Sequence, residues 1–156
     1  MTPTKGPIPE VTISQICDLN DRLSRAGDLS SVLAAAHEAF DGILLAIRGR
    51  EDPVTGMFAA LVMAAASAAD GRDAVTRAPS LPLAALRHAV LTRRAGEPEP
   101  GIRDLARSLG GIAGVLAGRL VQAGRDAAVA GDRDACAQAA ACAGEIHDLL
   151  AGATDE

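Results

Sequence analysis

The sequence contains very few aromatic residues: two phenylalanines, Phe40 and Phe58, and neither tyrosine nor tryptophan. Alanine, leucine, valine and isoleucine must therefore fill the core, and backbones that carry such small side chains must approach each other closely. Alanine is the best helix former and is uncommon in strands, so the composition favours helices. The scarcity of aromatic rings also argues against a site that stacks a planar ligand and favours a small aliphatic or polar one.

Cysteine and long apolar runs are also scarce, and acidic residues outnumber basic ones. Cys17, Cys136 and Cys142 form neither a zinc-type pair nor the dense, even set of a disulfide-stabilised secreted chain. The strongly apolar stretch at residues 57–69 is shorter than the roughly 18 residues that indicate a membrane span. The net charge of -5 disfavours general nucleic-acid binding. We therefore expect a reduced, cytoplasmic protein that contacts no membrane, and nucleic acid is not an expected partner.

Sequence motifs for metals and nucleotides are absent as well. The sequence has no HExxH, CxxC or ExxH pair, and no two histidines are close enough to share a helix. The glycines at 110–118 are not followed by Lys-Ser or Lys-Thr, as they would be in a phosphate-binding loop. We accordingly expect neither a metal site nor a cofactor.

Apolar residues recur at three- and four-residue steps, and this spacing predicts an all-α compact bundle of five to six helices. The expected helices cover residues 12–27, 30–49, 53–70, 80–94, 102–127 and 133–151. The helix near 53–70 is apolar on almost every side, which predicts a central position in the bundle. We expect a single helical domain at 11–152, a flexible N-terminal tail at 1–10 and a C-terminal tail at 153–156.

Three polar side chains fall on apolar helix faces. His37 lies in the apolar stripe of the helix at 30–49, His147 in that of the last helix, and Asn20 in that of the first. A buried imidazole or amide without a partner costs about 1–3 kcal/mol. Such residues either bond to groups on neighbouring helices and fix their register, or they line a functional pocket.

The pocket hypothesis places a site between the helices at 30–49 and 133–151. Acidic residues accompany both histidines, and Asp41 lies one turn from His37, where a carboxylate can orient an imidazole ring. The two histidines would then act as an acid–base pair on a small non-aromatic ligand. The candidate residues are His37, His147 and Asp41 for catalysis, and Asn20, Glu38 and Asp148 for ligand binding.

Glycine recurs every four residues at Gly110, Gly114 and Gly118, within the helix expected at 102–127. Each glycine costs a helix roughly 0.5–1 kcal/mol relative to alanine, so the ladder indicates that something packs closely against it. Close packing on the alanine-rich helix at 53–70 is one explanation. An interface between two copies, or a gap for a ligand, is the other.

The segment IRDLARSLGGIAGVLAGRLVQAG, residues 102–124, carries a short known pattern. Its apolar, small, apolar and turn positions are occupied by Leu105, Ala106, Leu109 and Gly110. In these positions the segment resembles the helix-turn-helix core of winged-helix repressors, which implies a DNA-binding regulator with its recognition helix at 112–120. That helix offers only Arg119 as a polar side chain, whereas reading base edges requires several polar groups.

Three functional hypotheses follow. The first is a non-enzymatic helical interaction or regulatory module that works as a homodimer or binds another helical protein. The second is a small enzyme or small-molecule binder that uses the His37/His147 pocket, and the third is a degenerate winged-helix regulator that uses 102–124. We favour the first, because the sequence lacks a nucleotide loop, metal-ligand spacing and an aromatic ligand box.

Overall fold

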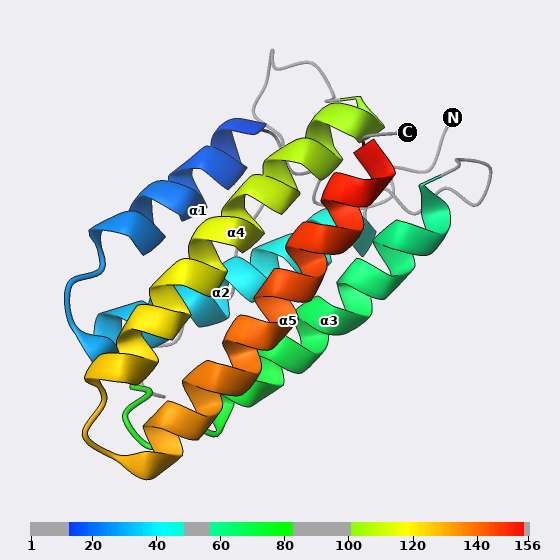
Figure 1. Ribbon diagram of the computed structural model, residues 1–156. Coiled ribbons are helices and arrows are strands. Elements are labelled where there is room, and N and C mark those ends of the chain that lie inside the picture. The colour runs from blue at the N-terminus through cyan, green and yellow to red at the C-terminus, as the bar shows by residue number, and fades with distance from the viewer. Residues whose placement is uncertain (1–12, 49–56, 83–100, 155–156) are drawn as a thin grey trace, which may run out of the picture.

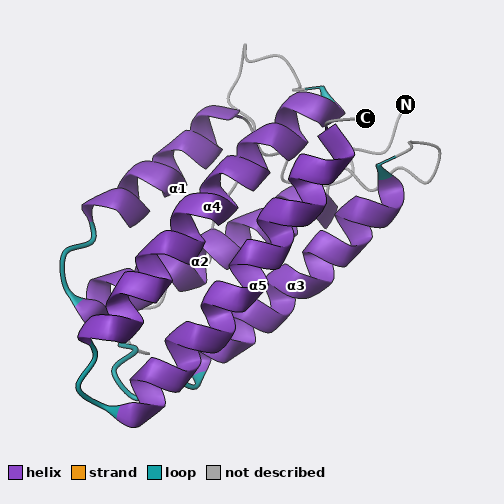
Figure 2. Cartoon of the chain, viewed as in Figure 1, coloured by secondary structure: helices purple, strands orange, loops and turns teal. Residues whose placement is uncertain are grey.

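The computed structural model describes residues 13–48, 57–82 and 101–154 of the chain (Figure 1). The elements in these ranges are α1 (Ile13–Arg25), α2 (Leu29–Arg48), α3 (Phe58–Thr76), α4 (Ile102–Asp126) and α5 (Ala130–Thr154). Figure 2 shows helices and loops but no strand in this part of the chain, so the prediction of an all-α bundle is confirmed. The helix expected at 80–94 falls largely outside the described residues, and the tail expected at 1–10 falls wholly outside them.

Four helices form a row in the order α1, α4, α5, α3, and α2 lies behind that row (Figure 1). The α4–α5 pair is antiparallel and has the most extensive contact among the five helices of the described ranges. α2 packs against α1, α3 and α4, whereas α5 packs against α4 and α3. The outer surfaces of α4 and α5 consequently lie side by side on one face of the bundle.

The most buried helix is α2, with twelve of its 20 residues buried, and not the helix near 53–70. The prediction that the latter is central was wrong, because α3 leaves Val62 and Met63 exposed at 40% and 52%. Alanine makes a helix appear apolar on every side, yet exposing its single methyl group costs little free energy. The larger leucine, isoleucine and phenylalanine side chains of α2 lose more by exposure, and they take the central place.

The length and apolar character of α2 are sufficient for a helix that crosses a membrane. However, 67% of the most apolar 18-residue segment of α2 is buried inside the bundle. Its apolar residues therefore have partners within the chain itself, as expected of a core helix.

A single continuous helix, α4, covers the segment that resembles a helix-turn-helix. The predicted apolar register is confirmed by five buried residues: Leu105, Leu109, Ile112, Leu116 and Leu120. The resemblance implies a turn at Gly110, and this implication was wrong, since Gly110 lies inside the helix. A glycine weakens a helix by only about 1 kcal/mol, and packing against α5 along its length outweighs that cost.

Two further glycines, just outside the expected ranges 53–70 and 133–151, lie inside helices. α3 continues through Gly71 to Thr76, and α5 begins before Gly131 and reaches Thr154, beyond the expected start of the C-terminal tail. A methyl group at Gly71 would lie 2.3 Å from the ring of Phe40. The absence of a side chain at Gly71 therefore serves the close approach of α2 and α3, and does not end the helix.

The N-terminus of α5 is fixed by the segment that follows α3. Asp132 is fully buried, and its carboxylate accepts hydrogen bonds from the backbone N–H and the hydroxyl of Ser80, at 2.9 and 2.6 Å. The Ser80 carbonyl in turn accepts a hydrogen bond from the hydroxyl of Ser30 at 3.2 Å. An acidic side chain in the first turn also interacts favourably with the helix dipole, which explains why α5 starts here.

Candidate functional site

The first candidate histidine, His37, lies in the core on α2 and is 5% exposed, as predicted. Asp41, one turn later, is equally buried, and its Oδ1 accepts a hydrogen bond from Arg72 of α3 at 2.8 Å. This ion pair joins α2 to α3, and Arg72 itself remains partly accessible. Asp41 therefore has a structural partner that the sequence hypothesis, which assigned it only to His37, did not include.

The second candidate histidine, His147, is exposed, so the prediction that it lies within the buried stripe of the last helix was wrong. Its Nδ1 donates a hydrogen bond to the carbonyl oxygen of Gly110 on α4, 2.9 Å away. The ring lies beside Gly114, where a methyl group would be 3.2 Å from Nδ1. Because these α4 positions have no side chains, nothing covers the imidazole, and it contacts the α4 backbone at the surface.

The two histidines do not share any cavity described here. His37 belongs to α2 and His147 to α5, and these helices are not among the main contacting pairs. A surface hollow of about 200 Å³ beside His147 is bordered by α4 and α5 alone, including Arg107 and Thr154. The acid–base pair stays a prediction, and the described geometry offers it no common pocket.

The proposed ligand-binding residues are separated too. Glu38 forms an ion pair with Arg22 of α1 at 2.7 Å, and Asp148 is exposed on α5. Asn20 is half-buried on α1, and its Oδ1 is buried without a hydrogen bond to the described residues. Asp148 is therefore apart from the other two residues, because α5 is not a main contact of α1 or α2.

Metal and thiol chemistry receive no support from the described residues. Within them no three His, Cys, Asp or Glu side chains are grouped so that they could hold a metal ion. Burial raises the pKa of the Cys136 thiol, and the nearby Asp132 adds to this effect. Burial likewise raises the pKa of Cys142, with further contributions from Asp70 and Glu145. A raised pKa keeps a thiol protonated at neutral pH and makes it a poor nucleophile.

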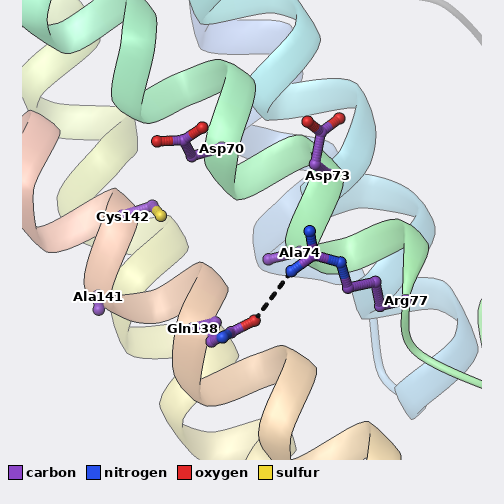
Figure 3. Close-up of a pocket in the computed structure, with 7 residues that line it drawn as sticks. All are labelled: Asp70, Asp73, Ala74, Arg77, Gln138, Ala141 and Cys142. Carbon is purple, nitrogen blue, oxygen red and sulfur yellow. Dashed lines mark hydrogen bonds between the residues drawn. The ribbon is translucent and has the colours of Figure 1, made fainter.

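A polar groove of about 300 Å³ lies between α3 and α5 (Figure 3). Its lining residues are Asp70, Asp73, Ala74, Arg77, Gln138, Ala141 and Cys142. Arg77 and Gln138 approach each other across the groove at 3.5 Å, the dashed line in Figure 3. The groove offers carboxylates, an amide and a guanidinium on its surface, but its polar side chains are not buried and do not converge on one point.

The glycines that recur every four residues in α4 differ in whether they contact α5. Gly110 and Gly114 face α5, where a methyl group would lie 3.5 Å from Leu150 and 3.2 Å from His147 respectively. Close packing thus explains them, but the expectation that they pack on the helix near 53–70 was wrong. At Gly118 a methyl group would meet no atom within 4 Å, and the same holds at the neighbouring Gly111.

An apolar groove of about 360 Å³ lies between the last turns of α4 and the first turns of α5. Its lining residues are Leu120, Val121, Gly124, Arg125, Arg133 and Ala137. Val121 is 43% exposed in this groove. Arg133 donates to the carbonyls of the α4–α5 turn, whereas Arg125 makes no hydrogen bond or ion pair with the described residues.

The groove continues into two outer stripes, which together we call the α4–α5 face. The α4 stripe consists of Arg107, Gly111, Gly114, Gly118, Val121 and Arg125, and the α5 stripe of Asp134, Ala137, Ala141, Glu145, Asp148 and Gly152. All of these residues except the half-buried Gly114 are exposed. The α4 stripe is basic at both ends, and the α5 stripe carries three acids.

A second spacing in the sequence indicates this face, in addition to the glycines at every fourth residue. From Arg107 to Arg125 the α4 stripe alternates steps of four and three residues, the spacing of a seam that packs on another helix. The sequence hypothesis included Gly114 and Gly118 but omitted the valine and the two arginines. All three lie on the exposed side of α4, away from its buried leucines.

Comparison with known proteins adds no relative: no family model matches the sequence, and no curated protein or solved structure matches it significantly.

Proposed function

We propose that this chain is a helical interaction module that works as a homodimer, and that two copies meet through the α4–α5 face. The apolar groove at the end of this face carries the proposal. It exposes Val121 and Ala137 to water, and a second protein surface that covers the groove would gain the free energy of burying these two side chains.

The glycines at positions 111 and 118 support the same face. Each costs α4 roughly 0.5–1 kcal/mol relative to alanine, and the bundle has room for a methyl group at both positions. Packing within one chain therefore does not require glycine there. A helix of another chain that crosses α4 closely would require it, since small residues let two backbones approach.

The dimensions of the face suit a dimer. Helices of 25 residues such as α4 and α5 are about 37 Å long, and two helices side by side are about 20 Å wide. The face therefore offers roughly 700 Å² per copy, close to the area of about 800 Å² per partner that is typical of stable complexes.

The other two hypotheses have weaker support in the described residues. The pocket hypothesis needs His37 and His147 together, and they belong to helices that are not a main contacting pair. The DNA-binding hypothesis needs Arg119 to be available, but its guanidinium donates to the carbonyl of Ala26 and so holds α1 against α4. The interaction module requires neither arrangement.

A pair of matched valine variants tests the proposed face. Val121→Asp places a charge in the apolar groove, and Val62→Asp makes the same change at a similarly exposed valine of α3. We expect sedimentation velocity at high micromolar concentration to give a monomer for Val121→Asp and a dimer for both Val62→Asp and the native chain. A monomeric Val62→Asp variant beside a dimeric Val121→Asp variant would assign the interface to α3 and contradict the proposal.

A further inference from the structure

We infer that a two-fold axis parallel to α4 and α5 relates the two copies, so that α4 of each copy lies antiparallel on α5 of the other, with Arg125 facing Asp134. This inference rests on the proposed homodimer and specifies its geometry. The partner surface that it names is the acidic α5 stripe of a second copy of this chain.

Contacts within the chain show which residues of α4 lie beside which residues of α5, that is, at the same level along the two helix axes. Gly110 lies opposite Leu150 at one end of the pair, and Gly124 lies opposite Cys136 at the other, where a methyl group would be 3.1 Å from the Cys136 Cβ. Arg125 is thus level with the first turns of α5, which carry Asp134. Arg107, at the other end, is level with the last turns of α5, beyond Asp148.

Two symmetric arrangements bring this face against its own copy with the helices of the two copies aligned. A homodimer with two-fold symmetry uses the same patch on both subunits, so each contact occurs twice. An axis parallel to the helices leaves the height of every residue along the helices unchanged. It places α4 of each copy on α5 of the other copy. An axis perpendicular to the helices, in the plane of the face, instead places α4 on the other copy's α4 and α5 on the other copy's α5. The two helices of each pair are then antiparallel.

Charge distinguishes these two arrangements. With the perpendicular axis, Arg107 of one copy faces Arg125 of the other, and Asp134 faces the last turns of α5, beyond Asp148. Like charges then meet at both ends of the α4–α4 pair. With the parallel axis, Arg125 of each copy faces Asp134 of the other, so that opposite charges meet twice in the dimer and the two arginines of α4 are kept apart. Complementary charges of this kind fix register and exclude the alternative pairing.

The charged residues in question are available for a partner. Arg125 and Asp134 are both exposed, and neither makes a hydrogen bond or ion pair within the described part of the chain. The parallel axis also brings Val121 of one copy over Ala137 and Ala141 of the other. These two small side chains leave room for the valine, and the groove that holds Val121 in each copy is closed by the other copy.

Charge reversal on the full-length chain tests this arrangement. Arg125→Glu and Asp134→Lys each replace two attractive pairs per dimer by two repulsive ones, and we expect each variant to raise the dimer dissociation constant about fivefold or more at low ionic strength. In an equimolar mixture of the two variants, a dimer can form from one copy of each. In that dimer both facing pairs are again of opposite charge. The mixture is therefore expected to dimerise as tightly as the native chain, when measured by sedimentation equilibrium.

Arg25→Glu, on the exposed last turn of α1, is the matched control, because it changes the net charge by the same amount away from the face. Tighter or unchanged dimerisation of Arg125→Glu, a mixture that does not recover, or an equal effect of Arg25→Glu would each overturn the parallel-axis arrangement, even though a dimer exists. A native chain that stays monomeric at every concentration would instead refute the homodimer itself.

Discussion

Asp41 and Asp132 are buried carboxylates, and each is satisfied by a group that lies far away in the sequence. Arg72 bonds to Asp41 across α2 and α3, and Ser80 bonds to Asp132 at the start of α5. Helical periodicity could place His37 on the buried side of its helix, and the structure confirms that position. It could not identify partners on other helices, because periodicity describes one helix at a time.

The exposed His147 also shows that helical periodicity describes only one helix at a time. Its angular position on α5 lies close to the buried stripe, but the neighbouring surface of α4 consists of Gly110 and Gly114. A side chain is covered only if its neighbours have atoms to cover it. That property depends on which helix packs there, and the sequence assigned these glycines to the wrong helix.

The N-terminus of α2 provides a prediction at a single residue. The Asp28 carboxylate accepts a hydrogen bond from the backbone N–H of Ser31 at 3.0 Å, and hydrogen bonds from Ser31 lower the pKa of Asp28 below its ordinary value of 3.8. A lowered pKa in the folded state means that the ionised carboxylate stabilises the fold above pH 3.8, and that this stability is lost as the pH falls through the folded-state pKa.

We therefore expect Asp28→Ala to lower the melting temperature at neutral pH, by a difference that shrinks as the pH is lowered below 3.8. Thermal unfolding followed by circular dichroism measures this difference. Asp21→Ala, which removes an exposed carboxylate from the middle of α1, serves as the control and should change the melting temperature little. A difference for Asp28→Ala that is constant or grows toward low pH would contradict the capping role.

At the scale of the element, the bounds of every described helix except α3 followed from the sequence to within three residues. Four of the five helices in the described ranges begin within three residues of the expected position, because their apolar stripes are regular. Gly71 and Gly131 lie just outside the expected ranges 53–70 and 133–151, yet both are inside helices. Both positions contact another segment closely, Phe40 in one case and Pro79 in the other, and this contact explains the glycine.

The contact between Gly71 and Phe40 leads to a prediction on the α2–α3 packing. A methyl group at Gly71 would overlap the phenylalanine ring, so we expect Gly71→Ala to lower the free energy of unfolding by about 1–3 kcal/mol. Gly144→Ala, in the middle of α5 with no atom within 4 Å of the added methyl, should raise it by roughly 0.5–1 kcal/mol. Urea unfolding measures both, and a Gly71→Ala variant as stable as Gly144→Ala would show that the helices can separate freely.

At the scale of the whole molecule, composition and periodicity were sufficient for the all-α class but not for the order of the helices. Alanine-rich α3 was expected at the centre, and its exposed Val62 and Met63 place it at the edge of the row. The outer stripes of α4 and α5 emerge only when both helices are seen side by side. One stripe is basic at its ends, the other is acidic, and small residues lie between the charges.

The measurement that tests the homodimer most directly is sedimentation equilibrium of the native, full-length chain over a series from low to high micromolar concentration. We predict a mass that rises from one chain toward two chains and does not continue to larger assemblies, because a two-fold interface uses the same face on both copies and closes on itself. A mass of one chain that does not change up to the highest concentration would contradict the proposal.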